Sequence, residues 1–234
     1  MSERPLLLIT GIAEGLGAAT ARAFAEAGYD VLGVARSDRA VPVVAHEVAE
    51  RGGLYTHVAC DLTHPAALAA ALGPHAGRVA ACVHNAHRLL IAPCEEIAVE
   101  EFEQVWRVNC LGAFAIARLV LPGMTARKAG TMIFAGATAG LRGGAKFAAF
   151  ASSKFAVRGL AQALAREYGP RGIHITHVVL DGLIDEAQSD RRFGPASSPR
   201  MDADAVASAY LQLARQHPSA WTHELDLRPY SEGF

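Results

Sequence analysis

The chain has 234 residues, of which 51% are hydrophobic and 19% are charged, and its formal net charge is -1. This length is sufficient for one α/β domain with a large buried core. The near-neutral charge balance excludes an electrostatic case for nucleic acid or an anionic membrane surface as a partner.

Short apolar runs alternate with longer helical patterns along the whole chain. Strands separated by helices indicate βαβ units with parallel pairing, and strands that are apolar at consecutive positions indicate a sheet covered on both faces. The sequence therefore predicts one α/β domain over residues 1–234, a doubly wound parallel β-sheet with helices on both faces. The predicted strands are residues 6–9, 29–35, 54–60, 78–84, 131–135, 173–180 and 224–227. The predicted helices are residues 18–26, 41–51, 65–72, 99–128, 150–168 and 203–216.

Three further features concern a possible substrate lid, the membrane and the cysteines. Residues 185–204 mix Asp, Ser, Gly, Pro and Arg without periodicity, which predicts a loop or lid that sets substrate specificity. No uninterrupted apolar run approaches the ~18 residues of a membrane span, so no membrane partner is expected. The cysteines have no metal-ligand spacing and the start of the chain does not resemble a secretory signal, which predicts reduced thiols, no metal site and a cytoplasmic location.

A glycine-rich segment, TGIAEGLG at residues 10–17, lies between the first predicted strand and the first predicted helix. A tight turn and the close approach of a pyrophosphate both favour positions without a Cβ, and the following helix offers free N–H groups to phosphate. The strand–loop–helix context is the one that a dinucleotide site requires. The predicted cradle consists of Gly11, Ile12, Gly15, Leu16 and Gly17.

The end of the second predicted strand bears on the choice between NAD and NADP. An acidic residue there would hold the ribose 2′-hydroxyl, whereas arginine accommodates a 2′-phosphate. The chain has Arg36 and Ser37, which can donate hydrogen bonds to a phosphate. Glu14 on the glycine loop opposes this choice if its carboxylate faces the phosphate. The sequence favours NADP over NAD.

Several motifs resemble those of the short-chain dehydrogenase/reductase family, whose fold is Rossmann-like. The T-G-x-x-x-G-x-G spacing of the glycine loop is similar to the family pattern, and the segment ending at Lys154 resembles the family's Y-x-x-x-K element. Phe150 stands at the place of the catalytic tyrosine, and Ala137, thirteen residues earlier, at the place of the catalytic serine. Further matches are Asp61 and Leu62 beside the adenine, Asn85 and Ala86 after the fourth strand, Asn109 in the central helix, and Gly182 and Ile184 in the segment after the sixth strand.

The resemblance implies hydride transfer coupled to proton transfer, and it also implies that this chain lacks two of the groups that assist that reaction. In the family the tyrosine exchanges a proton with the substrate while hydride moves, the lysine holds the ribose, the serine binds the substrate oxygen and the asparagine supports a water relay. Phenylalanine has no proton to donate and alanine cannot polarise a carbonyl. Each loss is expected to cost roughly 10²–10⁴ in rate unless another group takes over.

The groups that remain for catalysis by this resemblance are Lys154, which would clamp the ribose, and Asn109, which would either serve a relay or brace a helix bend. Thr138 follows Ala137 and could offer a hydroxyl. Asp181, at the end of a strand, would act either as an acid or base or as a loop cap. His84 and His87 flank the Asn-Ala pair and are alternatives, although histidines in such loops are more often structural.

Three functions follow from these residues. The first is an NADP(H)-dependent oxidoreductase that acts on a small molecule without a catalytic tyrosine, either because the acceptor is already activated, as in an iminium, or because an acidic substrate such as a phenol supplies its own proton. The second is a lyase, dehydratase or isomerase in the same pocket. The third is a catalytically inactive dinucleotide-binding sensor or partner subunit. The resemblance also implies a homodimer or homotetramer formed through the two long helices, near residues 99–128 and 150–168, and the last strand.

Overall fold

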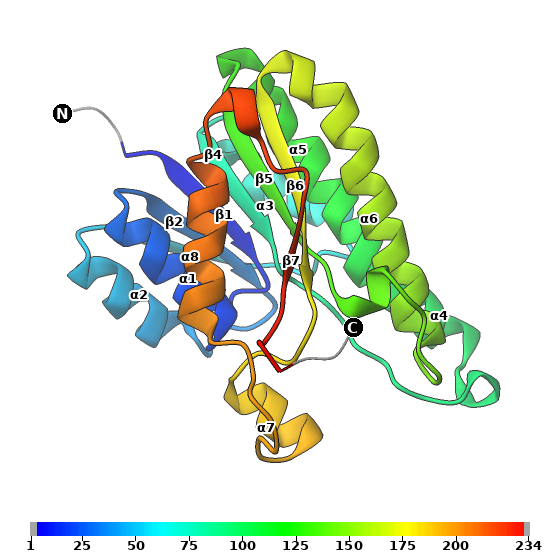
Figure 1. The fold of residues 1–234 in the computed structure, drawn as a ribbon. Coiled ribbons are helices and arrows are strands. Elements are labelled where there is room, and N and C mark those ends of the chain that lie inside the picture. Colours follow the sequence, from blue (N-terminus) through cyan, green and yellow to red (C-terminus); the bar gives the residue numbers. More distant parts are fainter. Residues whose placement is uncertain (1–3, 232–234) are drawn as a thin grey trace.

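Apolar residues at consecutive strand positions build a sheet that is buried on both faces. The computed structural model describes residues 4–231, and its seven-stranded parallel sheet has the order β3-β2-β1-β4-β5-β6-β7 (Figure 1). This confirms the predicted fold class. The strands are β1 Leu6–Thr10, β2 Asp30–Ala35, β3 Tyr55–Ala59, β4 Val79–His84, β5 Gly130–Ala135, β6 Ile173–Leu180 and β7 Glu224–Leu227.

Two layers of helices cover the sheet because neighbouring strand residues point to opposite faces. Leu7 and Ile9 of β1 pack in one cluster with α1, α2 and α8, whereas Leu6 and Leu8 pack in the other with α3, α5 and α6 (Figure 1). The longer helices are α1 Leu16–Glu26, α2 Val41–Glu50, α3 Pro65–Ala76, α4 Val99–Trp106, α5 Gly112–Arg127, α6 Ala148–Tyr168, α7 Ala187–Phe193 and α8 Ala203–Ala214. Short 3₁₀ turns are η1 Cys94–Glu96, η3 Thr138–Gly140, η4 Gly169–Arg171 and η5 Pro218–Ala220.

The order of the strands fixes where a ligand can enter. β1 pairs with β2 on one side and with β4 on the other, so the chain reverses its direction of winding between β1 and β4. A doubly wound sheet has a crevice at such a switch point, outside the carboxyl ends of the strands. The loops that follow β1, β4, β5 and β6 all lie at this edge.

Two segments differ from the sequence-based expectation. The predicted lid contains a helix, α7, and a β-bridge that joins Ile184 to Met201. The predicted helix over residues 99–128 is divided by a π-helical segment, η2 Arg107–Leu111, between α4 and α5. Side-chain periodicity did not indicate either feature.

The stretch Val99–Arg127 is the one candidate membrane span within residues 4–231, with a mean hydropathy of 1.4 over its most apolar window. This differs from the expectation that no run approaches such a span, because a mean tolerates the few polar residues that interrupt it. Of that window, 56% is buried inside the fold. Residues such as Ile116 and Leu121 belong to the core beneath the sheet, so packing accounts for the apolar character of this helix.

Candidate functional site

A cavity of about 580 Å³ opens at the carboxyl edge of the sheet. Its walls come from the start of α1, the loops after β4, β5 and β6, the first turns of α6, and the lid with α7. Leu16 lines it at the glycine loop and Lys154 lines it on α6. One continuous space therefore connects the predicted phosphate cradle with the predicted catalytic residues.

The glycine loop has the backbone that a phosphate cradle needs. Gly11 has a φ of +72°, and a Cβ there would lie 2.5 Å from the Cα of Ala86. Gly15 has a φ of +89° and is the N-cap of α1 without a side chain. Gly17, in the first turn of α1, lies so close to Ile12 that a Cβ would be 3.1 Å from its Cα. Side chains at these positions would strain the turn or close the cradle.

A carboxylate from the lid already contacts this cradle. Oε2 of Glu186 accepts a hydrogen bond from the backbone N–H of Leu16 at 3.3 Å. A Cβ placed on Gly15 would be only 1.9 Å from the same oxygen. Burial raises the pKa of Glu186, and the Leu16 N–H and the Arg191 guanidinium oppose that rise. The α1 N-terminus is thus capped by a residue 170 positions away in sequence.

Phe150 and Ala137 lie together in one apolar cluster on the cavity wall. Phe150 is buried, with 7% of its surface exposed, and packs with Ala139 and Ala151. Leu89, Ala137 and Phe147 pack against this cluster. The two positions that the sequence assigns to the missing hydroxyl groups are therefore brought into one place, which is lined by carbon atoms.

Lys154 is buried beside this cluster, with 4% of its surface exposed. Its Nζ donates a hydrogen bond to the Ala135 carbonyl at 2.8 Å and lies 5.6 Å from the centre of the Phe150 ring. Burial lowers the pKa of Lys154 to about 8. No carboxylate within residues 4–231 forms a salt bridge with it. A buried ammonium without an anionic partner is poised to meet polar groups of a ligand.

Asp181 and Thr138 also line the cavity, but they are bound to each other. The Thr138 hydroxyl donates a hydrogen bond to Asp181 Oδ1, and Arg228 forms a salt bridge with Asp181 Oδ2 at 3.1 Å. Asp181 is almost completely buried, at 3% exposure. Its partners are a hydroxyl group and a guanidinium, so the carboxylate ties the ends of β6 and β7 to the loop after β5.

Asn109 does not line the cavity. It lies in the π-helical segment, where its Oδ1 accepts from the Arg88 N–H at 2.7 Å and its Nδ2 donates to the Arg88 carbonyl at 3.2 Å and to Ser153 Oγ at 2.8 Å. These bonds use both amide hydrogens and fasten the loop after β4 to α6. The contacts agree with the bracing role that the sequence left open.

The two histidines flanking the Asn-Ala pair differ in exposure. His84 is buried against Thr10, its Nδ1 lies 3.0 Å from the Thr10 hydroxyl, and burial followed by the Lys154 charge lowers its pKa to about 3. His87 lines the cavity with an exposed edge and meets the edge of the Phe150 ring at a centroid distance of 6.4 Å. Surrounding protein atoms and then Lys154 lower the pKa of His87 as well. His87 is therefore a titratable group that faces the cavity.

The remaining predicted cofactor residues follow the crevice toward β2 and β3. Arg36 and Ser37 are exposed after β2, and Glu14 is exposed on the glycine loop. Asp61 accepts hydrogen bonds from the backbone and hydroxyl of Thr63 at 2.8 Å. Burial raises the pKa of Asp61, but those bonds and the nearby Arg36 charge outweigh the effect of burial and lower the pKa overall.

The other predicted cofactor residues lie along the crevice or the cavity. Leu62 is buried, and Asn85 donates to the Gly11 carbonyl at 3.4 Å. Ala86 packs on Gly11, and Gly182 and Ile184 line the cavity.

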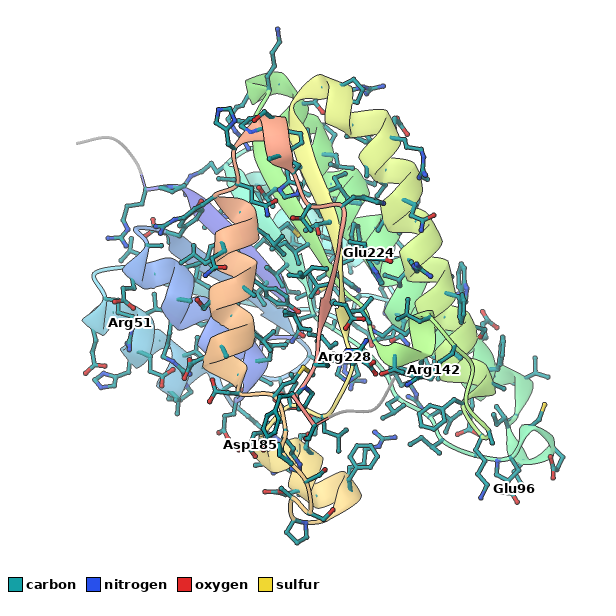
Figure 2. All side chains as sticks on the ribbon, viewed as in Figure 1. Arg51, Glu96, Arg142, Asp185, Glu224 and Arg228 are labelled. Carbon is teal, nitrogen blue, oxygen red and sulfur yellow. The ribbon has the colours of Figure 1, made fainter. Side chains whose placement is uncertain are left out.

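Neither Glu186 nor Arg228 was expected in the site from the sequence. Arg192 of the lid also lines the cavity, and it donates to the Leu89 carbonyl at 2.6 Å. Arg142 also lines the cavity, and neither guanidinium forms a salt bridge within residues 4–231. Figure 2 shows Arg142 and Arg228 at the same end of the sheet as Asp185 of the lid. The cavity is therefore predominantly cationic.

The geometry agrees with comparisons with known proteins. The sequence model of the family described as short chain dehydrogenase matches residues 5–192. A 3-alpha-(or 20-beta)-hydroxysteroid dehydrogenase from Mycobacterium bovis is 32% identical over 186 residues, which cover 78% of this chain and 70% of that protein.

Two solved structures are similar in both fold and sequence. A short-chain dehydrogenase from Rhodopseudomonas palustris has a TM-score of 0.85 and 31% identity, covering 98% of this chain and 100% of that chain. A metagenomic short-chain oxidoreductase in complex with NADP has a TM-score of 0.83 and 27% identity, covering 96% of both chains.

The buried state of Lys154 leads to a measurable dependence of stability on pH. The folded pKa of about 8 lies below the ordinary value of 10.5, so between these two values the unfolded chain binds more protons and stability rises with pH. Below the folded pKa the lysine is protonated in both states and destabilises the fold. We expect the free energy of unfolding of wild type, relative to Lys154→Met, to rise from pH 8 to about pH 10. Denaturant titrations across this range test it, with the exposed Lys128→Met as control; equal slopes for wild type and Lys154→Met would contradict it.

Proposed function

The chain belongs to the short-chain dehydrogenase family of oxidoreductases, and on that premise we propose that it is an NADP(H)-dependent enzyme that acts on a small molecule without a catalytic tyrosine. The observation that carries the proposal is the single cavity that joins the glycine cradle at Leu16 to Lys154 and Phe150. A structural relative in complex with NADP supports the choice of cofactor.

Different residues of the chain would bind different parts of the cofactor, which would supply or accept the hydride. The loop from Gly11 to Gly17 would bind the pyrophosphate through backbone N–H groups. Arg36 and Ser37 would bind the 2′-phosphate, and Asp61 would lie by the adenine. Lys154 would hold the ribose hydroxyls and, being uncompensated, would place a positive charge beside the reacting atoms.

Phe150 has no proton to donate, so the proton that the substrate needs must come from another group. Thr138 and Asp181 form a hydrogen-bonded pair on the cavity wall, and His87 also lines the cavity. We assign the Thr138 hydroxyl and His87 as the groups that can exchange a proton near the substrate, whereas Asp181 is engaged by Arg228 and Asn109 acts as a brace. None reproduces the free hydroxyl of a tyrosine, so the acceptor itself has to be activated.

The charge of the cavity limits which class of acceptor molecule can bind. Lys154, Arg142 and Arg192 line it without carboxylate partners within residues 4–231, and Asp181 and Glu186 are the acidic residues among its lining. A positive cavity repels a cationic iminium and attracts an anion. Of the activated acceptors compatible with the missing tyrosine, an acidic one that supplies its own proton therefore fits better.

A second candidate is an inactive dinucleotide-binding protein. It is favoured by the observation that Thr138, Asp181 and Asn109 all have internal hydrogen-bond or salt-bridge partners. The same salt bridge disfavours a lyase or isomerase that would use Asp181 as its base. One assay distinguishes a binding protein from an enzyme, because only the enzyme consumes NADPH.

Cofactor choice is tested by titration with NADPH and NADH, followed by cofactor fluorescence. We expect NADPH to bind more tightly, and Arg36→Ala to weaken NADPH by about tenfold, since a charge-assisted hydrogen bond contributes ~1.5–3 kcal/mol, while NADH is nearly unchanged. The exposed neighbour Arg39→Ala is the matched control. Equal affinity of wild type for both cofactors would reject the role of Arg36, and the absence of binding of both NADPH and NADH would reject the proposed function.

The altered catalytic positions are tested by restoring them. Wild type is expected to consume NADPH with acidic, activated acceptors and not with simple ketones. The double variant Phe150→Tyr with Ala137→Ser is expected to reduce simple ketones at a rate at least ~10²-fold above wild type, because it regains a proton donor. The loss of NADPH absorbance measures both rates. If the double variant binds NADPH and remains inactive, the site has been remodelled beyond these two residues.

We also propose that two or four copies of the chain associate through α4 and α6. Val99, Phe102 and Trp106 are spaced at i, i+3 and i+7 on α4, so they share one face, and their exposures are 77%, 40% and 39%. Phe155 on the adjacent α6 is 44% exposed. Such a row of exposed apolar side chains is typical of an interaction surface.

Light scattering at micromolar concentration tests this association. Wild type is expected to have the mass of a dimer or tetramer, and Trp106→Glu to shift it toward the monomer, because a charge at the centre of an apolar interface loses its hydration. Leu54→Glu changes an exposed apolar residue just before β3 and is expected to leave the mass unchanged. A monomeric wild type would reject the proposal.

A further inference from the structure

The contact between the lid and the glycine cradle has a consequence for cofactor binding. Glu186 is half-buried, and its carboxylate lies directly over Gly15 and accepts from the N–H of Leu16. Gly15 is a position without a Cβ and with a positive φ, where the space above the backbone is open to an anion. The lid carboxylate fills that space.

The chemistry of this contact is that of an anion at a helix N-terminus. The first N–H groups of α1 have no partner within the helix, and the helix dipole attracts negative charge. α1 has no acidic residue in its first turn and no side-chain cap from Gly15. A carboxylate from the lid satisfies the same donors that a pyrophosphate would use, and two anions cannot share them.

We propose that Glu186 is an internal competitor of the cofactor's pyrophosphate, so that cofactor binding requires the carboxylate to leave the cradle and releases the lid segment that carries it. This inference rests on the proposed dinucleotide site. It identifies Glu186 as a residue that sets cofactor affinity. The residue belongs to the lid and not to the glycine loop, so it links occupancy of the cradle to the position of the substrate cover.

The backbone around Glu186 allows such a release. Gly182 has a φ of +153° at the point where the chain leaves β6, and a short bridge follows in which Asp185 N donates to the Met201 carbonyl at 2.8 Å. Glu186 comes directly before α7, and Arg192 on that helix holds the Leu89 carbonyl. Displacement of the Glu186 side chain therefore removes one of the attachments that hold α7 over the cavity.

Glu186→Gln is the sharpest variant, because it keeps the shape of the side chain and removes its charge. Asp185→Asn is the matched control, since it removes a neighbouring, exposed carboxylate of the same lid segment (Figure 2). In a fluorescence titration with NADPH we expect Glu186→Gln to bind about tenfold more tightly than wild type, and Asp185→Asn to bind like wild type.

A second readout does not depend on the cofactor. Trypsin can cleave the lid after Arg191 and Arg192 once α7 is released. In the absence of NADPH, we expect Glu186→Gln to be cleaved there several times faster than wild type and Asp185→Asn. Circular dichroism confirms that all three proteins are folded before the digestion.

The outcomes separate this inference from the proposed function. If wild type binds NADPH and Glu186→Gln binds it equally or more weakly, the competitor role is overturned while the dinucleotide site stands. If wild type fails to bind and Glu186→Gln binds, the competitor role and the dinucleotide site are both supported, while the proposed enzymatic function of the wild-type chain is rejected. If neither binds NADPH, the competitor role and the dinucleotide site are both overturned. Equal rates of lid cleavage for wild type and Glu186→Gln would overturn the link between the carboxylate and the lid.

Discussion

The parallel pairing of β1 with β2 and β4 is the constraint on which the other features of the site depend. Since all seven strands run in one direction, their carboxyl ends meet at one edge of the sheet, and the loops that follow them face a common crevice. The reversal of winding beside β1 keeps that crevice open. Gly11 can lie against Ala86 only because β1 and β4 are neighbours, and this contact joins the glycine loop to the loop that carries His87.

Within that crevice, charge and apolar surface are distributed unevenly. Asp181 is neutralised by Arg228, and Glu186 lies at the positive end of α1, so both acids have positive partners. Lys154 donates to a carbonyl oxygen and has no carboxylate in a salt bridge within residues 4–231. The cluster around Phe150 shields this ammonium on one side with carbon atoms, and burial makes its field stronger than it would be in water. We expect such a site to favour anionic ligands and to exchange protons poorly.

Much of this arrangement could be predicted from local sequence patterns. The predicted limits of all seven strands lie within one residue of the observed ones, and the glycine spacing located the turn after β1, because strand burial and tight turns depend on residues close in sequence. Lys154 and Phe150 followed from a motif. The contact of Glu186 with Leu16 spans 170 residues, and the partnership of Asp181 with Arg228 joins two strand ends. No periodicity encodes such pairs, so they became visible only in the folded chain.

The π-helical segment around Asn109 also bears on how the helical stretch from α4 to α5 can gain or lose a residue. A π turn closes its hydrogen bond over one more residue than an α turn, so the wider turn absorbs one residue within an otherwise regular helix. α4 and α5 keep their own faces on either side of it, with Trp106 outside and Ile116 in the core. Loss of one residue from Arg107–Leu111 would leave a continuous α-helix with nearly the same faces. It would withdraw the amide that fastens Arg88 to Ser153, so a single insertion or deletion can create or abolish the brace without redesigning the fold.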